Sequence, residues 1–215
     1  MSELRVDQAV IADLVTEGAR ILDLGCGDGL LLEYLFRHKR VKGFGVEISE
    51  EGIRSCISRG LPVYHGDIDQ GLEDHRDGAF DFVILSHTLQ TIHHPRLVLE
   101  EMLRVGRKGI VSFPNFAHWR VRLTLMLEGR MPKTPVLPFD WYDTPNIHMC
   151  SIKDFQGLCR EMNVNILKQI PLNSAGHLPQ GGIKGWMAKH LLPIAGANLI
   201  APMAVFLLEK KEPTP

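Results

Sequence analysis

A buried strand followed by a glycine-rich turn and a helix constrains this chain more than any other feature. Ile21–Leu24 is an apolar run typical of a strand inside a parallel sheet. Three glycines follow at alternate positions: Gly25, Gly27 and Gly29. Apolar residues then recur at helical spacing: Leu31, Leu32, Leu35 and Phe36. Because glycine lets a ligand approach the backbone closely at a helix N-terminus, we predict a small-molecule pocket at this turn.

The spacing of the glycines narrows the ligand class. A dinucleotide fingerprint requires G-x-G-x-x-G, but Leu30 stands three positions after Gly27. No Gly-Lys-Ser or Gly-Lys-Thr sequence follows the turn to hold a triphosphate. Asp23 instead begins an Asp-x-Gly-x-Gly-x-Gly pattern, which suits a ligand without a pyrophosphate whose amino and hydroxyl groups need acceptors. This pattern resembles motif I of the class I S-adenosylmethionine-dependent methyltransferases.

Predicted strands and helices alternate along most of the chain. Further strands are expected over 41–47, 61–65, 80–86, 109–114, 164–170 and 203–208. Helices are expected over 7–15, after Ser49, over 95–105 and 116–127, and from Ser151. This alternation predicts a doubly wound, Rossmann-like α/β sheet. The resemblance to class I methyltransferases implies about seven strands, the last antiparallel, in one domain over 1–215.

The composition places the chain among ordinary globular proteins, with 45% hydrophobic and 23% charged residues. Its formal net charge of −1 gives no electrostatic reason to bind nucleic acid or an anionic membrane. The four cysteines form no C-x-x-C pair, which predicts neither a zinc site nor a disulfide framework. The N-terminal residues lack an apolar signal core, so we expect a cytoplasmic protein.

The stretch Leu191–Leu208 is uncharged and about long enough to span a membrane. Two prolines, Pro193 and Pro202, interrupt it, and Gly196 and Asn198 weaken it further. We therefore expect two shorter elements that end in a buried strand over 204–208, and no membrane span.

Two acidic residues follow the carboxyl ends of other predicted strands, and such ends meet at one edge of a parallel sheet. A carboxylate at Glu47 can accept the hydroxyl protons of a ribose. Asp67 can accept from an adenine amino group while the Ile68 backbone N–H donates to the ring. The alternatives are that Glu47 is a solvated acid ending a strand and that Asp67 belongs to a simple turn.

The opposite end of the cofactor would lie at the first and fourth strands. The Gly25 carbonyl and the backbone around Ser86 can meet its ammonium group, and Asp23 can orient the loop. The remaining predicted cofactor-binding residues are Cys26, Gly27, Gly29, Ile48 and His87. Together these residues predict a site for S-adenosylmethionine or S-adenosylhomocysteine.

Three segments make the resemblance more specific. Residues 85–95 read LSHTLQTIHHP, residues 112–119 read SFPNFAHW, and residues 141–148 read WYDTPNIH. With these segments, the helix start at Lys153-Asp154-Phe155 and its length, the chain resembles the methionine biosynthesis protein MetW family over most of its extent. That resemblance implies a cytoplasmic bacterial protein that works with homoserine O-acyltransferase in methionine synthesis.

The sequence assigns no catalytic residue. It contains no Asn/Asp-Pro-Pro-Tyr motif, and no Pro-Cys follows the fourth strand. Histidines are available, but loop, capping or partner contacts are favoured over a general base, and their spacing predicts no metal site. They are His87, His93, His94, His118 and His148. Cys26 is expected to be a small packing residue.

Two hypotheses follow for the whole protein. The first is an accessory subunit of homoserine O-acyltransferase whose bound cofactor reports methionine supply. The alternative is a methyltransferase whose small-molecule acceptor lies under the segment Met131–His148. Residues 129–150, rich in proline and aromatics, are interpreted as a lid, a partner-binding insertion or plain cover for the core. Residues 172–200 are interpreted as a C-terminal excursion.

Overall fold

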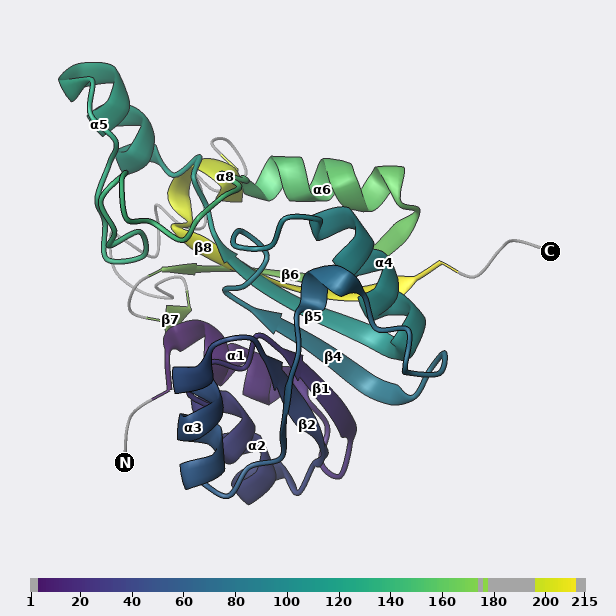
Figure 1. Cartoon of the computed structure of the whole chain (residues 1–215). Coiled ribbons are helices and arrows are strands. Elements are labelled where there is room, and N and C mark those ends of the chain that lie inside the picture. The colour runs from purple at the N-terminus through teal and green to yellow at the C-terminus, as the bar shows by residue number, and fades with distance from the viewer. Residues whose placement is uncertain (1–3, 174–175, 178–195, 212–215) are drawn as a thin grey trace.

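The computed structural model describes residues 4–173, 176–177 and 196–211, and these build one mixed sheet (Figure 1). The strand order is β3-β2-β1-β4-β5-β8-β6-β7. The strands are β1 (Arg20–Leu24), β2 (Lys42–Glu47), β3 (Val63–His65), β4 (Phe80–Ser86), β5 (Gly106–Pro114), β6 (Val164–Asn173), β7 (Gly176–His177) and β8 (Met203–Lys210). The helices are α1 (Val6–Leu14), α2 (Leu30–Lys39), α3 (Glu50–Ser58), η1 (Ile68–Gln70), α4 (Pro95–Val105), α5 (Trp119–Glu128), α6 (Ile152–Glu161) and α8 (Ala197–Ile200).

The predicted α/β sheet is confirmed, and all seven predicted strands are present. Neighbouring strands from β3 to β5 pair in parallel, whereas β8 runs antiparallel between β5 and β6. The eighth strand, β7, has two residues at the sheet edge and is too short to give a hydrophobic period. Most of the predicted excursion over 172–200 lies outside the described residues.

Helices cover both faces of the sheet because successive strand residues point to opposite sides. In β1, Ile21 packs with α1, α2 and α3, while Leu22 and Leu24 pack with α4 and α6. Figure 1 shows α1, α2 and α3 on one side of the sheet and α4 and α6 on the other. Both faces of the central strands are therefore dry, which explains their continuous apolar runs.

Helix starts follow their capping residues closely. Ser49 accepts a hydrogen bond from the Gly52 N–H, and Ser151 forms a reciprocal capping box with Asp154. The helix predicted from Phe116 begins three residues later, because the Asn115 side chain accepts from the Ala117 N–H and holds a turn there. The Asn115 side chain also donates to the carbonyls of Asn198 and Ala201, which ties this turn to α8.

The helix α5 projects away from the sheet (Figure 1). Among its residues only Val121 is buried. The predicted strand at 204–208 is confirmed within β8, and no helix in the described part of the chain is long and apolar enough to cross a membrane.

Candidate functional site

The glycine turn after β1 is held by backbone hydrogen bonds to the neighbouring strand. The N–H groups of Gly25 and Cys26 donate to the Val46 carbonyl at 2.8 and 3.2 Å. Gly25 has a φ of 70°, and a Cβ there would lie 2.7 Å from Cγ2 of Thr88. Both the positive φ and the lack of space therefore require glycine at this position.

The third glycine of the motif has a different role. Gly29 begins α2 with a φ of 78°, and a Cβ there would lie 2.7 Å from Leu61 and 2.8 Å from the Cys56 sulfur. Gly29 therefore allows α2 and α3 to pack closely, and it does not line a cavity with the other predicted residues.

Glu47 ends β2 and folds its carboxylate back onto the turn. Oε2 accepts from the Gly27 N–H at 2.8 Å, and Oε1 accepts from Ile48 and Ser49 at 3.0 and 2.8 Å. A carboxylate offers about four lone pairs, so three backbone donors leave space for about one more, at Oε2. Glu47 is buried and is not the solvated acid of the alternative interpretation. It fixes the turn and keeps one acceptor for a ligand.

A cavity of about 320 Å³ opens beside this carboxylate. Gly25, Glu47, Ile48, Asp67 and Ile68 all line it. Oδ1 of Asp67 accepts from the Asp69 N–H at 2.9 Å and so caps η1, while Oδ2 has only a long contact of 3.5 Å to Gln70. Asp67 therefore belongs to a turn, as the alternative held, and still offers an acceptor oxygen to the cavity.

A second cavity of about 420 Å³ adjoins the first, because Gly25 lines both. Asp23, Cys26, Gly27 and Ser86 line it as well. Nine of the eleven predicted cofactor residues thus line two cavities that meet at Gly25, and the exceptions are Gly29 and His87.

Asp23 is the unusual group of the second cavity. Its side chain is buried, and within the described part of the chain no group donates a hydrogen bond to Oδ1. Burial raises the pKa of Asp23 to about 7, which the positive charge of Arg5 opposes and the negative charge of Glu47 reinforces. An unpartnered buried acceptor beside a cavity suits a cationic ligand group such as an ammonium. Together with Gly25 and Gly27, whose backbone lines the same cavity without side chains, this acceptor makes the site fit the amino-acid end of S-adenosylmethionine.

Cys26 also lines this cavity, but its sulfur is committed to packing. It lies 3.8 Å from the Cys56 sulfur, and burial raises the pKa of the Cys26 thiol. A Cβ at Gly45 would lie 2.4 Å from the same sulfur, which shows how tightly it is enclosed. The thiol is therefore a poor nucleophile, in agreement with the predicted packing role.

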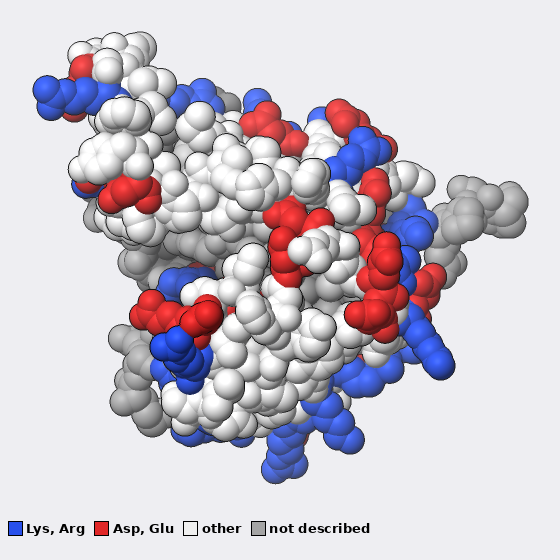
Figure 2. Space-filling model, viewed as in Figure 1, with Lys and Arg blue, Asp and Glu red and all other residues white. Residues whose placement is uncertain are grey.

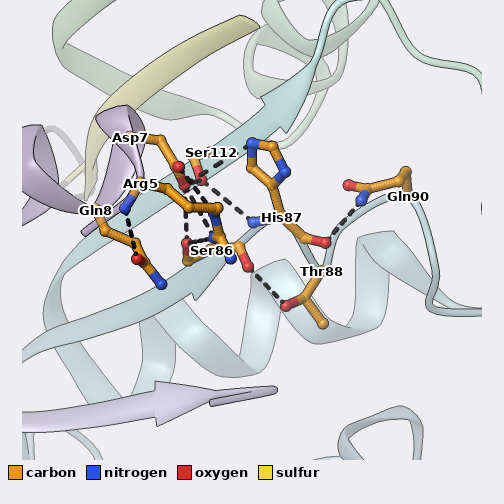
Figure 3. A network of polar contacts seen from close by, with 8 residues as sticks. All are labelled: Arg5, Asp7, Gln8, Ser86, His87, Thr88, Gln90 and Ser112. Atoms are coloured by element: carbon orange, nitrogen blue, oxygen red, sulfur yellow. Dashed lines mark hydrogen bonds and ion pairs between the residues drawn. The ribbon is translucent and has the colours of Figure 1, made fainter. Parts of the chain in front are cut away.

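A polar network that the sequence did not indicate lies next to the second cavity (Figure 3). Asp7 is almost fully buried, and its carboxylate accepts from Arg5, from Ser86 at 2.9 Å and from Ser112 at 2.9 Å. Burial alone would raise the pKa of Asp7, but His87, Arg5 and Ser112 outweigh burial and hold the pKa at about 2. The network fastens α1 to the carboxyl ends of β4 and β5.

Arg5 is a second residue of this network, besides Ser86, that lines the cavity. Its guanidinium binds both oxygens of Asp7 and donates to the Ser86 hydroxyl at 2.9 Å, and Arg5 lines the second cavity beside Asp23. The sequence pattern indicated only an amphipathic helix here. The acidic residue in the first turn of that helix was the one available signal, and it gave no partner.

The loop after β4 connects the cavities to the segment 129–150. His87 has a φ of 55°, and its N–H donates to the Ser112 carbonyl and hydroxyl. The Gln90 side chain donates to the His87 carbonyl at 2.6 Å, and the Gln90 carbonyl accepts from Ile147 and His148 at 2.8 and 3.0 Å. Residues that line the first two cavities therefore share one short loop with the anchor of the segment 129–150.

Many apolar side chains of α5 and the segment 131–149 face solvent. Met126 and Leu127 are 71% and 74% exposed, and Trp141 and Tyr142 are 74% and 72% exposed. An apolar groove of about 560 Å³ runs between α5 and this segment. Figure 2 shows that the projecting end of the molecule is largely uncharged on the face drawn, with a few charged side chains at its tip.

Comparison with protein families gives one match along nearly the whole chain. The model of the family described as "Methionine biosynthesis protein MetW" matches residues 5–206. A relative from Rhodopirellula baltica, described as a bifunctional methionine biosynthesis protein MetXA/MetW, is 39% identical over 176 residues. This alignment covers 78% of the chain but 28% of the relative, so the chain spans little more than a quarter of that relative's length.

Solved structures agree on the fold. An S-adenosylmethionine-dependent methyltransferase from Mesorhizobium loti superposes with a TM-score of 0.65 at 15% identity, covering 94% of this chain and 96% of that one. An S-adenosylmethionine-dependent methyltransferase from Thermotoga maritima gives a TM-score of 0.63 at 19% identity, covering 96% and 88%. At such identities these likenesses establish a methyltransferase-like fold and nothing further.

Proposed function

The chain belongs to the MetW family of methionine biosynthesis proteins, and from this premise we propose that it binds S-adenosylmethionine or S-adenosylhomocysteine and acts as an accessory subunit of homoserine O-acyltransferase. The pair of cavities that meet at Gly25 is the observation that supports cofactor binding most directly. The proposal places the protein in the cytoplasm, with no role on nucleic acid or membranes.

In the proposed complex the adenosine occupies the first cavity. Glu47 accepts from a ribose hydroxyl through the free lone pair of Oε2, and Asp67 and the Ile68 N–H meet the adenine edge. If Glu47 accepts from both ribose hydroxyls, the Gly27 N–H must share Oε2 with them. We therefore expect the turn to adjust slightly when the ligand enters.

The amino-acid end of the ligand occupies the second cavity. Asp23 and the Gly25 carbonyl receive the ammonium group, and the Arg5 guanidinium pairs with the carboxylate. Arg5 is already oriented by Asp7 and Ser86, so binding immobilises little additional side chain. Arg5 was not among the residues predicted from the sequence.

The partner assignment rests on the relative from Rhodopirellula baltica, whose name joins MetXA and MetW in one protein. We take the MetXA part as the homoserine O-acyltransferase. Two parts joined in one protein commonly work together. The solvent-facing apolar side chains of α5 provide a surface for such a partner. A ten-residue helix with one buried residue gains little stability from its own chain, and packing against a partner would supply it.

Cofactor binding and partner binding are linked through the loop after β4. Thr88, Thr91 and Ile92 line the first cavity, and the Gln90 carbonyl in the same loop holds residues 147 and 148. A ligand that shifts this loop would change the surface near α5, and by linkage the partner would change ligand affinity equally. The bound cofactor would thereby report methionine supply to the acyltransferase.

The test combines the purified protein with the homoserine O-acyltransferase of the same organism. We expect a complex in calorimetry, and acyl transfer that changes when this subunit and then S-adenosylhomocysteine are added. M126E on α5 should weaken the complex at least tenfold, whereas I57E, a similarly exposed position on α3, should not. The partnership would be refuted if no complex forms, or if the rate of acyl transfer is the same with and without this subunit.

A second candidate function is methyl transfer to a small molecule, with the present chain as an enzyme in its own right. The observation that favours it is a third cavity, of about 530 Å³, beneath residues 135–146 and next to His87. Labelled methyl groups that leave S-adenosylmethionine in the presence of an acceptor would support this function over a purely accessory role.

A further inference from the structure

The third cavity lies between α1, the loop after β4 and the segment 129–150. Its wall is mainly apolar and includes Pro135, Val136 and Phe139, while Arg5, His87 and Gln90 contribute polar groups. Residues 135–146 pass over it because Ile147 and His148 are fastened to the Gln90 carbonyl. A largely apolar wall with a few convergent polar groups is typical of sites for small organic molecules.

Gln90 lines this cavity and carries an unmet hydrogen-bond acceptor. The residue is 5% exposed, and its Nε2 donates to the His87 carbonyl, which fixes the orientation of the amide. Oε1 has no partner. A buried acceptor without a donor is costly, and a ligand N–H or O–H would satisfy it.

His87 is placed to receive a proton from the same ligand group. Nε2 of His87 faces the Asp7 carboxylate at 3.8 Å, and the other ring nitrogen points away from Asp7 (Figure 3). Burial lowers the pKa of His87, and Arg5 lowers it further against the opposing effect of Asp7, which favours the neutral imidazole. A neutral imidazole whose far side faces a carboxylate can accept a proton and be stabilised as a cation.

The third cavity adjoins the proposed cofactor site, because the cavities share lining residues. Arg5 lines both this cavity and the cavity that contains Asp23. Ser86, which lines the Asp23 cavity, directly precedes His87 in the chain. Thr91 lines both the third cavity and the first cavity. A molecule beside His87 therefore lies close to the junction of the two proposed cofactor cavities, where the sulfur of the cofactor would lie.

From this arrangement we propose that the third cavity is an acceptor site for a compact, mostly apolar molecule with one hydroxyl or amine group, held by Gln90 and deprotonated by His87. The proposal rests on the proposed cofactor site as the source of the methyl group. A lone pair of the acceptor oxygen or nitrogen forms the new bond to the methyl carbon. The carbon–sulfur bond breaks with its electron pair left on sulfur, and the acceptor proton passes to the imidazole and then to water.

The first experiment measures binding without any cofactor, with 2-naphthol and its hydroxyl-free counterpart naphthalene as probes. We expect 2-naphthol to bind about fivefold more tightly, the effect of one net hydrogen bond. Q90M should remove this preference. Q90E keeps an acceptor oxygen but loses the same donor to the His87 carbonyl, so it is the matched control and should retain the preference. Equal binding of the two probes, or an unchanged preference in Q90M, would overturn the site.

The second experiment places the probe relative to the cofactor. With S-adenosylhomocysteine bound, NMR should give interligand contacts between 2-naphthol and the ligand's amino-acid side chain, and their absence would contradict the acceptor position. With labelled S-adenosylmethionine, labelled 2-methoxynaphthalene should form. A bound probe that is never methylated would refute the acceptor role.

Variants of the histidine separate proton transfer from structure. H87N should reduce ether formation and leave probe binding within about twofold, because asparagine tolerates the left-handed backbone of position 87. H94N is the control, because His94 is an exposed histidine in the loop after β4. Equal ether formation by H87N and the unaltered protein would exclude the base role. If the unaltered protein does not bind S-adenosylhomocysteine, the cofactor proposal is refuted. Failure of the cofactor site is therefore distinguishable from failure of the acceptor site.

Discussion

Glutamine at position 47 tests the dual role of Glu47 in holding the turn and accepting a ribose hydroxyl. Three backbone N–H groups bind this carboxylate, at Gly27, Ile48 and Ser49. If the amide oxygen of E47Q stays with Ile48 and Ser49, the NH₂ group faces the Gly27 N–H and cannot accept from it. The substitution therefore removes one charge-assisted bond within the protein and the one free acceptor offered to the ligand.

Each loss has a magnitude that can be worked from the structure. A hydrogen bond to a charged group contributes about 1.5–3 kcal/mol. We expect the free energy of unfolding of E47Q to fall by about 2 kcal/mol, which lowers the melting temperature by roughly 4–8 °C in a domain of this size. The binding free energy of S-adenosylhomocysteine should weaken by about 2 kcal/mol as well, or roughly 30-fold in Kd.

Calorimetric titration with S-adenosylhomocysteine and thermal melts measure the two effects separately. E50Q is the matched control, because Glu50 is exposed on α3 and pairs with Arg54. It should change stability by less than about 0.5 kcal/mol and leave affinity unchanged. If E47Q binds the ligand as tightly as the unaltered protein, Glu47 only holds the turn and the ribose assignment is wrong.

Substitutions at Asp7, Asp23 and Gly25 test three further positions around the site. The pKa of Asp7 is about 2, below its ordinary 3.8, so the ionised carboxylate stabilises the fold by about 2 kcal/mol above pH 4. This contribution is lost as the pH falls toward 2. D7N should therefore have a lower melting temperature at neutral pH, and its melting temperature should fall less steeply in acid. The pKa of Asp23 is raised to about 7, so its ionisation lowers the free energy of unfolding increasingly as the pH rises from about 4 to 7. D23N should gain up to about 4 kcal/mol of stability above pH 7 and nothing below pH 4. Equal gains in melting temperature above pH 7 and below pH 4 would contradict this. G25A should lose S-adenosylhomocysteine binding because its Cβ meets Thr88. G18A is the control, because Gly18 has a similar φ of 72° and an added Cβ there meets no described atom within 4 Å. It should cost about 1 kcal/mol of stability and retain binding in the same titration.

The elements that the sequence predicted well carry their signal locally. The strand around Ile21, the glycine turn and the helix after it follow from apolar spacing and glycine positions alone. The caps at Ser49 and Ser151 are equally local, since each involves residues three apart. Boundaries were less accurate where distant contacts fix a local turn. Asn115 donates to the carbonyls of Asn198 and Ala201, and the turn that it holds delays the start of α5.

Some of the predicted cofactor residues line the cavities as their position along the chain predicts, and others have a role that depends on packing. Glu47 and Asp67 follow strand ends, so parallel pairing of β1, β2 and β3 brings them to one edge of the sheet. Gly29 belongs to the same motif, but close packing of α2 on α3 gives it a structural role. Whether they bind S-adenosylmethionine stays a prediction that the E47Q and G25A measurements will decide.

The sequence by itself determined the doubly wound sheet, its glycine turn and the acids that face it, because a period of two or 3.6 residues and a strand end are readable from neighbours along the chain. Only the tertiary structure decided that Asp7 meets Ser86 and Ser112, which lie 79 and 105 residues away. It also decided that Gln90 keeps an unpartnered oxygen beside a third cavity, and that α5 presents apolar side chains to solvent. Such features depend on which distant surfaces meet, and no local pattern of residues records that meeting.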